Sequence, residues 1–86
     1  MRVYEIYLER AAERDLKRLA TNEFKQIIGK IKGLAVEPRP SGCRKIIGSK
    51  NDWRIRVGHY RVIYEVDDKE RVIKAFRVKH RKEVYR

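Results

Sequence analysis

The sequence predicts an α+β fold in which an N-terminal helical hairpin packs on one face of a small, antiparallel-rich sheet of about four to five strands. Three observations lead to this expectation. They are an aromatic and β-branched run at 2–7, apolar residues at helical spacing from 8 to 35, and alternating apolar and basic residues from 53 to 66. The expected order is β-α-α-β-β-β(-β), in a single domain spanning residues 1–86. Because the first strand precedes both helices, it must pair with a strand that is distant in sequence.

Two helices are predicted between the first strand and residue 36. The apolar positions of the first are Leu8, Ala11, Ala12, Leu16, Leu19 and Ala20, and those of the second are Phe24, Ile27, Ile28, Ile31, Leu34 and Ala35. Thr21 and Asn22 can end the first helix and cap the second, so the connection is very short. The segment 37–42 ends the second helix, because its prolines cannot continue a helix and restrain the residues before them.

The remaining strands are expected at 44–48, 53–57, 60–66 and about 71–78, with turns at 48–52 and 67–70. The last strand is almost continuously apolar, which is typical of a strand that is central or covered on both faces. A basic tail, 79–86, follows it.

The alternation from 53 to 66 predicts a cluster of guanidinium groups on one face of the sheet. Successive side chains of a strand point to opposite faces. The residues expected to face the core are Trp53, Ile55, Val57, Tyr60, Val62, Tyr64 and Val66. Arg54, Arg56 and Arg61 are then expected on the face opposite the helices. Lys45 and Arg77 extend this predicted basic surface.

The net charge favours an anionic partner for that surface. The formal charge is +11 at pH 7, with a balance of +3 over residues 1–40 and +8 over residues 41–86. Nucleic acid, an acidic protein and an anionic membrane are the candidate partners. Arginine binds phosphate well, which favours RNA. The alternative is a solvated sheet face, since Lys and Arg also protect strands from aggregation.

The tail carries residue types that acid–base chemistry uses, namely Lys79, His80, Arg81 and Tyr85. Cleaving RNA without a metal requires a deprotonated 2′-hydroxyl, a neutralised phosphorane and a protonated leaving oxygen. The alternative is that His80 and Tyr85 only finish a strand and pack the terminus. The sequence shows no metal-ligand spacing, phosphate loop or serine nucleophile motif. Cys43 is the only cysteine, so no intrachain disulfide can form and a reducing cytosol fits.

Four segments together resemble the RelE/ParE superfamily of prokaryotic toxins, and most closely the RelE-type mRNA interferases. Residues 12–19 (AERDLKRL) are similar to the A-x-x-D-L-K-x-L helix of that family, and 38–42 (PRPSG) to its P-x-P-x-G loop. Residues 53–64 (WRIRVGHYRVIY) resemble Y/W-R-I-R-V-G-x-Y-R-V-I-Y, and 80–85 (HRKEVY) resemble H-R-x-x-V-Y. The segments occur in this order, and the resemblance covers nearly the whole chain.

The resemblance implies a toxin of a type II toxin–antitoxin system that cleaves mRNA in the A site of a 70S-type ribosome, inhibits translation and arrests growth. Such endoribonucleases work by 2′-hydroxyl attack, leave a cyclic phosphate, and use no metal or other cofactor. The implied partner is a RelB-like antitoxin, acidic in its binding segment, in a toxin–antitoxin hetero-oligomer. The implied location is cytoplasmic, without membrane association.

The resemblance also implies roles for individual residues. Arg54 and Arg56 match positions at which family members carry basic residues that bind and orient RNA. Arg61 matches the arginine that stabilises the transition-state phosphate. The best-studied members carry lysines at the first two positions. Arginine keeps its proton, so Arg54 and Arg56 supply charge and are poor proton shuttles.

In the tail, Tyr85 matches a tyrosine that orients or activates the nucleophile. Arg81 matches the tail arginine of the family, with Lys79 as the alternative. His80 is the candidate for the proton-transfer duty that the two arginines cannot perform.

Two other functions remain open at this stage: a ParE-like inhibitor of DNA gyrase, and a non-catalytic RNA- or ribosome-binding module. The joint presence of Arg61, Arg81, His80 and Tyr85 favours the RNA-cleaving enzyme, because a gyrase inhibitor has no need of that set.

Overall fold

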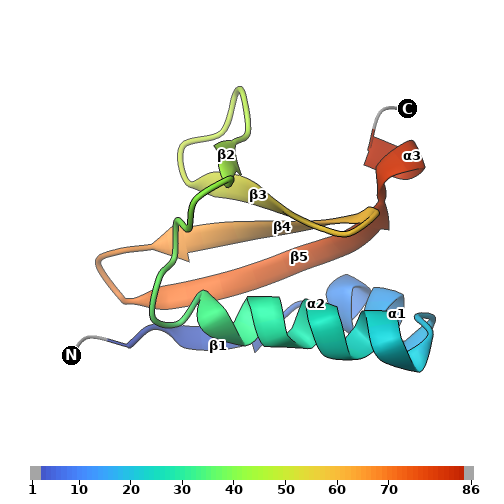
Figure 1. The fold of residues 1–86 in the computed structure, drawn as a ribbon. Helices are drawn as coiled ribbons and strands as arrows, with labels where there is room; N and C mark the ends of the chain where they lie inside the picture. The colour runs from blue at the N-terminus through green and yellow to red at the C-terminus, as the bar shows by residue number, and fades with distance from the viewer. Residues whose placement is uncertain (1–2, 85–86) are drawn as a thin grey trace.

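A computed structural model describes residues 3–84, which form one five-stranded sheet and three helices (Figure 1). The elements are β1 (Glu5–Leu8), α1 (Arg10–Lys17), α2 (Thr21–Gly33), β2 (Arg44–Lys45), β3 (Asp52–Val57), β4 (Tyr60–Asp67), β5 (Val72–His80) and α3 (Arg81–Val84). The α+β class and the order of strands and helices are as the sequence predicts. The short helix α3 was not expected.

The strand order in the sheet is β1-β5-β4-β3-β2. The β2–β3, β3–β4 and β4–β5 pairs are antiparallel, and β1 pairs in parallel with β5. This confirms that the first strand joins a partner distant in sequence, and that the last strand lies inside the sheet. The sheet is therefore mixed, with one parallel pair.

The two long helices cover one face of the sheet, as Figure 1 shows. The core between these layers contains Ala12, Leu16, Ile27, Ile31, Leu34, Ile55, Val62, Tyr64, Val66, Ile73, Ala75 and Val78. Tyr64 is fully buried, and its hydroxyl donates to the carbonyl of Pro38 at 2.7 Å, which satisfies the polar end of the side chain. Trp53 packs against the core, as its parity predicts.

Several boundaries differ from the sequence-based expectation. The first helix ends at Lys17, and the Arg18 amide closes its last turn on the Asp15 carbonyl at 3.2 Å. Ala20, and not Thr21 or Asn22, is the N-cap residue of α2, without a side-chain hydrogen bond. Phe24 is 40% exposed and does not belong to the core cluster, unlike the expected apolar positions Ile27 and Ile31 of this helix. Strand β2 has only two residues, because the chain beyond Lys45 turns away through the Ser49 N–H···O Ile46 hydrogen bond at 3.3 Å.

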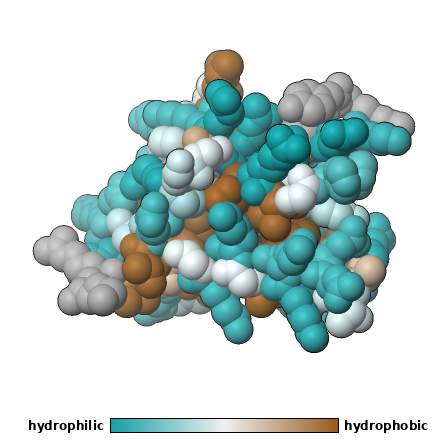
Figure 2. Space-filling model, viewed as in Figure 1, coloured by the Kyte–Doolittle hydropathy of each residue, from teal (hydrophilic) through white to brown (hydrophobic). Residues whose placement is uncertain are grey.

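The molecular surface is mainly hydrophilic. Figure 2 shows polar and charged side chains over most of the visible face, with apolar groups between them. This agrees with a sequence in which 41% of residues are charged. None of the helices formed by residues 3–84 has the length and the apolar run that crossing a bilayer requires.

Candidate functional site

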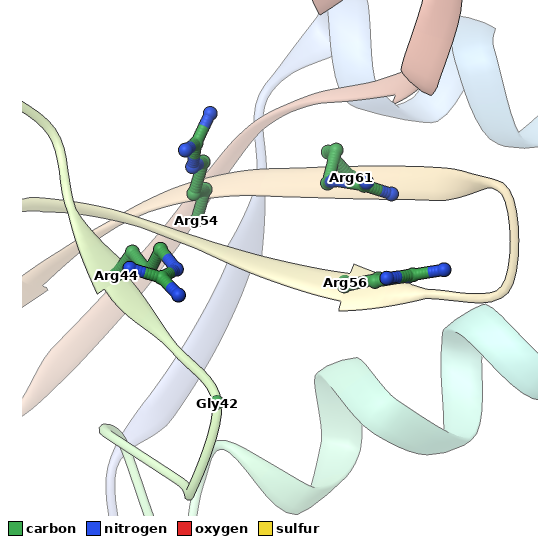
Figure 3. Close-up of a pocket in the computed structure, with 5 residues that line it drawn as sticks. All are labelled: Gly42, Arg44, Arg54, Arg56 and Arg61. Atoms are coloured by element: carbon green, nitrogen blue, oxygen red, sulfur yellow. The ribbon is translucent and has the colours of Figure 1, made fainter.

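Four arginines from three neighbouring strands line a pocket of about 290 Å³ on the face of the sheet opposite the helices (Figure 3). They are Arg44 of β2, Arg54 and Arg56 of β3, and Arg61 of β4, with Gly42 at the rim. We call this the arginine pocket. Arg44 lies directly across from Arg54, and Arg56 lies across from Arg61, so each is paired with a like charge. Directly opposed like charges destabilise a sheet, so the cluster carries an energetic cost.

The charge of the arginine pocket is not neutralised within the described part of the chain. The two salt bridges found among residues 3–84 join Arg39 to Asp68 and Arg77 to Asp15. The pocket is therefore a concentration of four positive charges that lacks a counterion from residues 3–84. Guanidinium groups offer several N–H donors in a planar fork, which suits phosphate oxygens.

The structure brings together the three arginines that the alternation predicts and adds Arg44. Arg44 was not predicted, because it lies outside the alternating segment 53–66, and Lys45 was expected to extend this surface instead. Lys45 lies across from Trp53, whose side chain belongs to the core face. Lys45 instead lines an adjoining hollow of about 280 Å³ with Ile46, Ile47 and Arg54. Lys45 therefore lies beside the arginine pocket and not in its lining.

Lys79 and Arg77 lie on β5 but differ in their surroundings. Lys79 lies directly across from Arg61, which extends the basic surface by one strand. Arg77 Nε donates to Asp15 Oδ2 at 2.8 Å, and the Val78 amide donates to the same oxygen at 2.8 Å. Arg77 is thus held in an ion pair that fastens α1 to the edge of β5, and it does not line the arginine pocket.

The charge state of Asp15 reflects these contacts. Burial alone would raise the pKa of the Asp15 carboxyl, but the hydrogen bonds from Arg77 and from the Val78 amide outweigh it. Together they hold the pKa below its ordinary value. The same carboxylate raises the pKa of the Arg77 guanidinium through their hydrogen bond. Both groups are therefore charged at neutral pH, as a structural ion pair.

His80 does not join the arginine pocket. It is the last residue of β5, and its ring meets Tyr60 edge-on, with centroids 5.3 Å apart. It lines a separate hollow of about 170 Å³ that also contains Asp15, Arg77 and Glu83. Strand parity gives the reason: His80 pairs with Tyr60, whereas Lys79 pairs with Arg61 of the pocket.

The contacts of His80 are those of a helix cap. Its Nδ1 accepts the Lys82 amide at 3.3 Å, and Glu83 Oε1 accepts the His80 amide at 3.1 Å. These reciprocal contacts form a capping box around the first turn of α3. Arg81 is exposed at the start of α3. Tyr85 lies outside the described residues.

Chemically, the arginine pocket can bind and neutralise phosphate, but residues 3–84 contribute no carboxylate, histidine or lysine to its lining that could serve as a base. A proton acceptor for RNA cleavage would have to come from elsewhere, such as the tail. Within residues 3–84, no group of three His, Cys, Asp or Glu side chains is arranged to hold a metal.

Comparison with curated protein sequences finds no significant match. Solved structures match closely. The chain aligns with RelE of the archaeal RelE–RelB complex from Pyrococcus horikoshii OT3 at 28% identity and a TM-score of 0.83, covering 92% of this chain and 96% of that one. The RelB–RelE complex from Methanococcus jannaschii matches at 30% identity and a TM-score of 0.76, covering 92% and 94%. The RelBE2 complex from Mycobacterium tuberculosis matches at 26% identity and a TM-score of 0.82, covering 93% of both chains.

The family described as "ParE toxin of type II toxin-antitoxin system, parDE" matches residues 6–85, nearly the whole sequence. This match and the likeness in fold to RelE toxins agree with the resemblance found in the motifs. The chain belongs to the RelE/ParE superfamily, the toxins of type II toxin–antitoxin systems.

Proposed function

We propose that this toxin is a RelE-type endoribonuclease that cuts mRNA in the ribosomal A site without a metal ion. The observation that carries the proposal is the arginine pocket, which four arginines line with no carboxylate partner from residues 3–84. Phosphate of an RNA backbone supplies the missing negative charge. The five-coordinate phosphorane formed by 2′-hydroxyl attack carries more negative charge than the ground-state phosphodiester, so the same arginines stabilise the transition state.

The proposed mechanism divides the work between the pocket and the tail. Arg61 neutralises the phosphate under attack by the 2′-hydroxyl, while Arg44, Arg54 and Arg56 hold adjacent backbone. The 2′-oxygen bonds to phosphorus as the P–O5′ bond breaks, and the leaving 5′-oxygen takes up a proton, which gives a cyclic phosphate and a free 5′-hydroxyl. Since arginine does not exchange protons near neutral pH, proton transfer is assigned to Tyr85 in the tail, and Arg81 contributes positive charge.

The proposed partner is a RelB-like antitoxin, in a hetero-oligomer with this toxin. The neighbours from P. horikoshii and M. jannaschii were solved as complexes of RelE with RelB, which supports the inference. An acidic antitoxin segment over the arginine pocket would supply the absent carboxylates and exclude RNA.

The test is primer extension on a message under translation by purified ribosomes. We expect cuts at fixed codon positions when ribosomes are present and few cuts on the same RNA without them. The variant Arg61→Ala should cut at least about 100-fold more slowly, the size of effect seen when one transition-state donor is removed. Intact message under both conditions would contradict the proposal.

The second candidate is a ParE-like gyrase inhibitor. Two observations favour it: the family description is that of ParE toxins, and the lining of the arginine pocket contains no base. It would predict inhibition of DNA supercoiling by purified gyrase, with translated mRNA left intact. Running the supercoiling and primer-extension assays on the same preparation therefore separates the two functions.

A further inference from the structure

Three consecutive carbonyl groups, two in the turn between β3 and β4 and one at the first residue of β4, each accept a hydrogen bond from a different arginine. The bonds are Arg56 Nε to Gly58 O at 3.4 Å, the Arg81 amide to His59 O at 2.7 Å, and Arg61 Nη1 to Tyr60 O at 3.2 Å. Two of these arginines line the arginine pocket, and Figure 3 shows both side chains running toward the turn. The third begins the tail helix α3. One short turn thus touches both parts of the proposed catalytic apparatus.

The backbone of this turn depends on glycine. Val57 and Tyr60 are the last paired residues of the hairpin, so Gly58 and His59 make a two-residue connection. Gly58 has φ 60°, whereas His59 is not among the residues of positive φ. A glycine of positive φ at the first central position is typical of a type II′ turn, which matches the twist of the flanking strands. The directions of the three carbonyls follow from that geometry.

Side chains of the turn hold the start of the tail as well. The His59 and His80 rings stack with centroids 6.1 Å apart and an angle of 28°, and Tyr60 meets His80 edge-on. His80 in turn caps α3. The first residues of the tail are therefore fixed to the turn through a backbone hydrogen bond and through a three-ring cluster.

We propose that Gly58 and His59 are positioning residues, and that the β3–β4 turn holds the start of the tail, His80 and Arg81, in register with Arg56 and Arg61. This inference rests on the proposed function, since it supplies what the arginine pocket lacks. The pocket has charge without a base, and the tail carries the groups to which proton transfer is assigned. The turn is the element that hydrogen-bonds to both.

The first test compares Gly58→Ala with Gly48→Ala. Gly48 also has positive φ, 88°, and a Cβ atom at either glycine would meet no atom within 4 Å. The two substitutions therefore impose backbone strain without a steric clash. In the free toxin, Gly58→Ala should speed hydrogen exchange of the Arg81 amide about ten-fold, from the strain of a left-handed alanine. Gly48→Ala should leave that exchange unchanged. Equal effects of the two variants, or none from Gly58→Ala, would overturn the inference.

The second test uses the His59 side chain and separates positioning from binding. His59→Ala removes the stacked ring, and His59→Phe restores one. In ribosome-dependent cleavage we expect His59→Ala to lower kcat about ten- to 100-fold, as misplacement of a catalytic group does, with KM unchanged. His59→Phe should recover most of the rate. A rise in KM at unchanged kcat, or no recovery with phenylalanine, would refute a positioning role.

The exchange measurement needs no RNA and no ribosome. If the wild type fails to cut mRNA but the Arg81 amide responds to Gly58→Ala alone, the proposed function is wrong and the coupling of turn to tail stands. If the wild type cuts mRNA but the Arg81 amide does not respond to Gly58→Ala, the proposed function stands and the coupling of turn to tail is wrong.

Discussion

Arg44 is the pocket residue that strand alternation in the sequence did not reveal. It faces Arg54 across the β2–β3 pair, whereas its neighbour Lys45 faces Trp53. We expect Arg44→Gln to weaken binding of single-stranded RNA and to reduce the slope of log affinity against log salt by about 0.7, one phosphate contact. Lys45→Gln removes the same charge one residue away and is the matched control. Fluorescence titration over a range of salt concentrations measures both, and a larger loss from Lys45→Gln would show that the register of β2 is wrong.

His80 can be tested for two distinct roles, capping and proton transfer. Its Nδ1 accepts the Lys82 amide, an acceptor position that the side-chain oxygen of asparagine can occupy. His80→Asn should therefore keep α3 folded and retain cleavage. His80→Ala should lose the cap, at a cost of about 1 kcal/mol to the tail helix. Backbone chemical shifts of residues 81–84 report the helix, and single-turnover cleavage reports the chemistry. Cleavage abolished equally by both substitutions would establish the acid–base role instead.

Helix α2 contains a glycine that lowers its stability. Gly29 lies inside this helix, and a Cβ atom there would meet nothing within 4 Å. Glycine within a helix costs about 0.5–1 kcal/mol relative to alanine. Gly29→Ala should therefore raise the free energy of unfolding by about that amount, measured by urea denaturation. If Gly29→Ala instead lowers the free energy of unfolding, the prediction is wrong, and the added methyl group must clash with a neighbouring group in solution.

The elements differ in how far sequence alone defines them. The two long helices and the β3–β4 hairpin follow from apolar periodicity and from Gly58, which are local signals. Which residue of β2 faces the open side of the sheet does not follow from local sequence, because a two-residue strand has no alternating pattern. The loop from Ile46 to Asn51 sets the register of β2 with β3. Helix α3 was also missed, although the spacing of His80 and Glu83 matches a capping box, because histidine is an unusual cap.

At the scale of the molecule, strand parity separates residues that the motifs place together. Arg54, Arg56 and Arg61 lie together on the open face, as alternation predicts. His80 and Arg77 belong to β5, the strand next to β4, but line the other hollow, beside Asp15. The pairing register of β5 with β4 places His80 in the other hollow, and the ion pair with Asp15 of α1 places Arg77 there. Neither contact can be predicted from local sequence. The roles assigned to these residues remain predictions.

Two carboxylates join segments that are distant in sequence, so folding stability should fall at acidic pH. Asp15 joins α1 to β5, and Asp68 accepts hydrogen bonds from Arg39 at 2.7 Å and from Tyr4 at 2.6 Å. Those hydrogen bonds lower the pKa of Asp68, and the pKa of Asp15 is lowered as well. A carboxyl whose pKa is lower in the folded state stabilises the fold at pH values above its unfolded pKa. The contribution disappears as the pH falls through the folded value.

Stability should therefore decline below about pH 4, where unfolded aspartates take up protons. Asp15→Asn should flatten that decline, because asparagine does not titrate. Near pH 7 the same change should cost about 1–3 kcal/mol, because the Val78 amide and Arg77 lose a charged acceptor. Glu13→Gln on the same helix is the control, since the Glu13 side chain makes no hydrogen bond or ion pair with residues 3–84. Urea denaturation at a series of pH values measures these effects. A decline that is equally steep in Asp15→Asn and the wild type would show that the Asp15 ion pair contributes nothing to acid sensitivity.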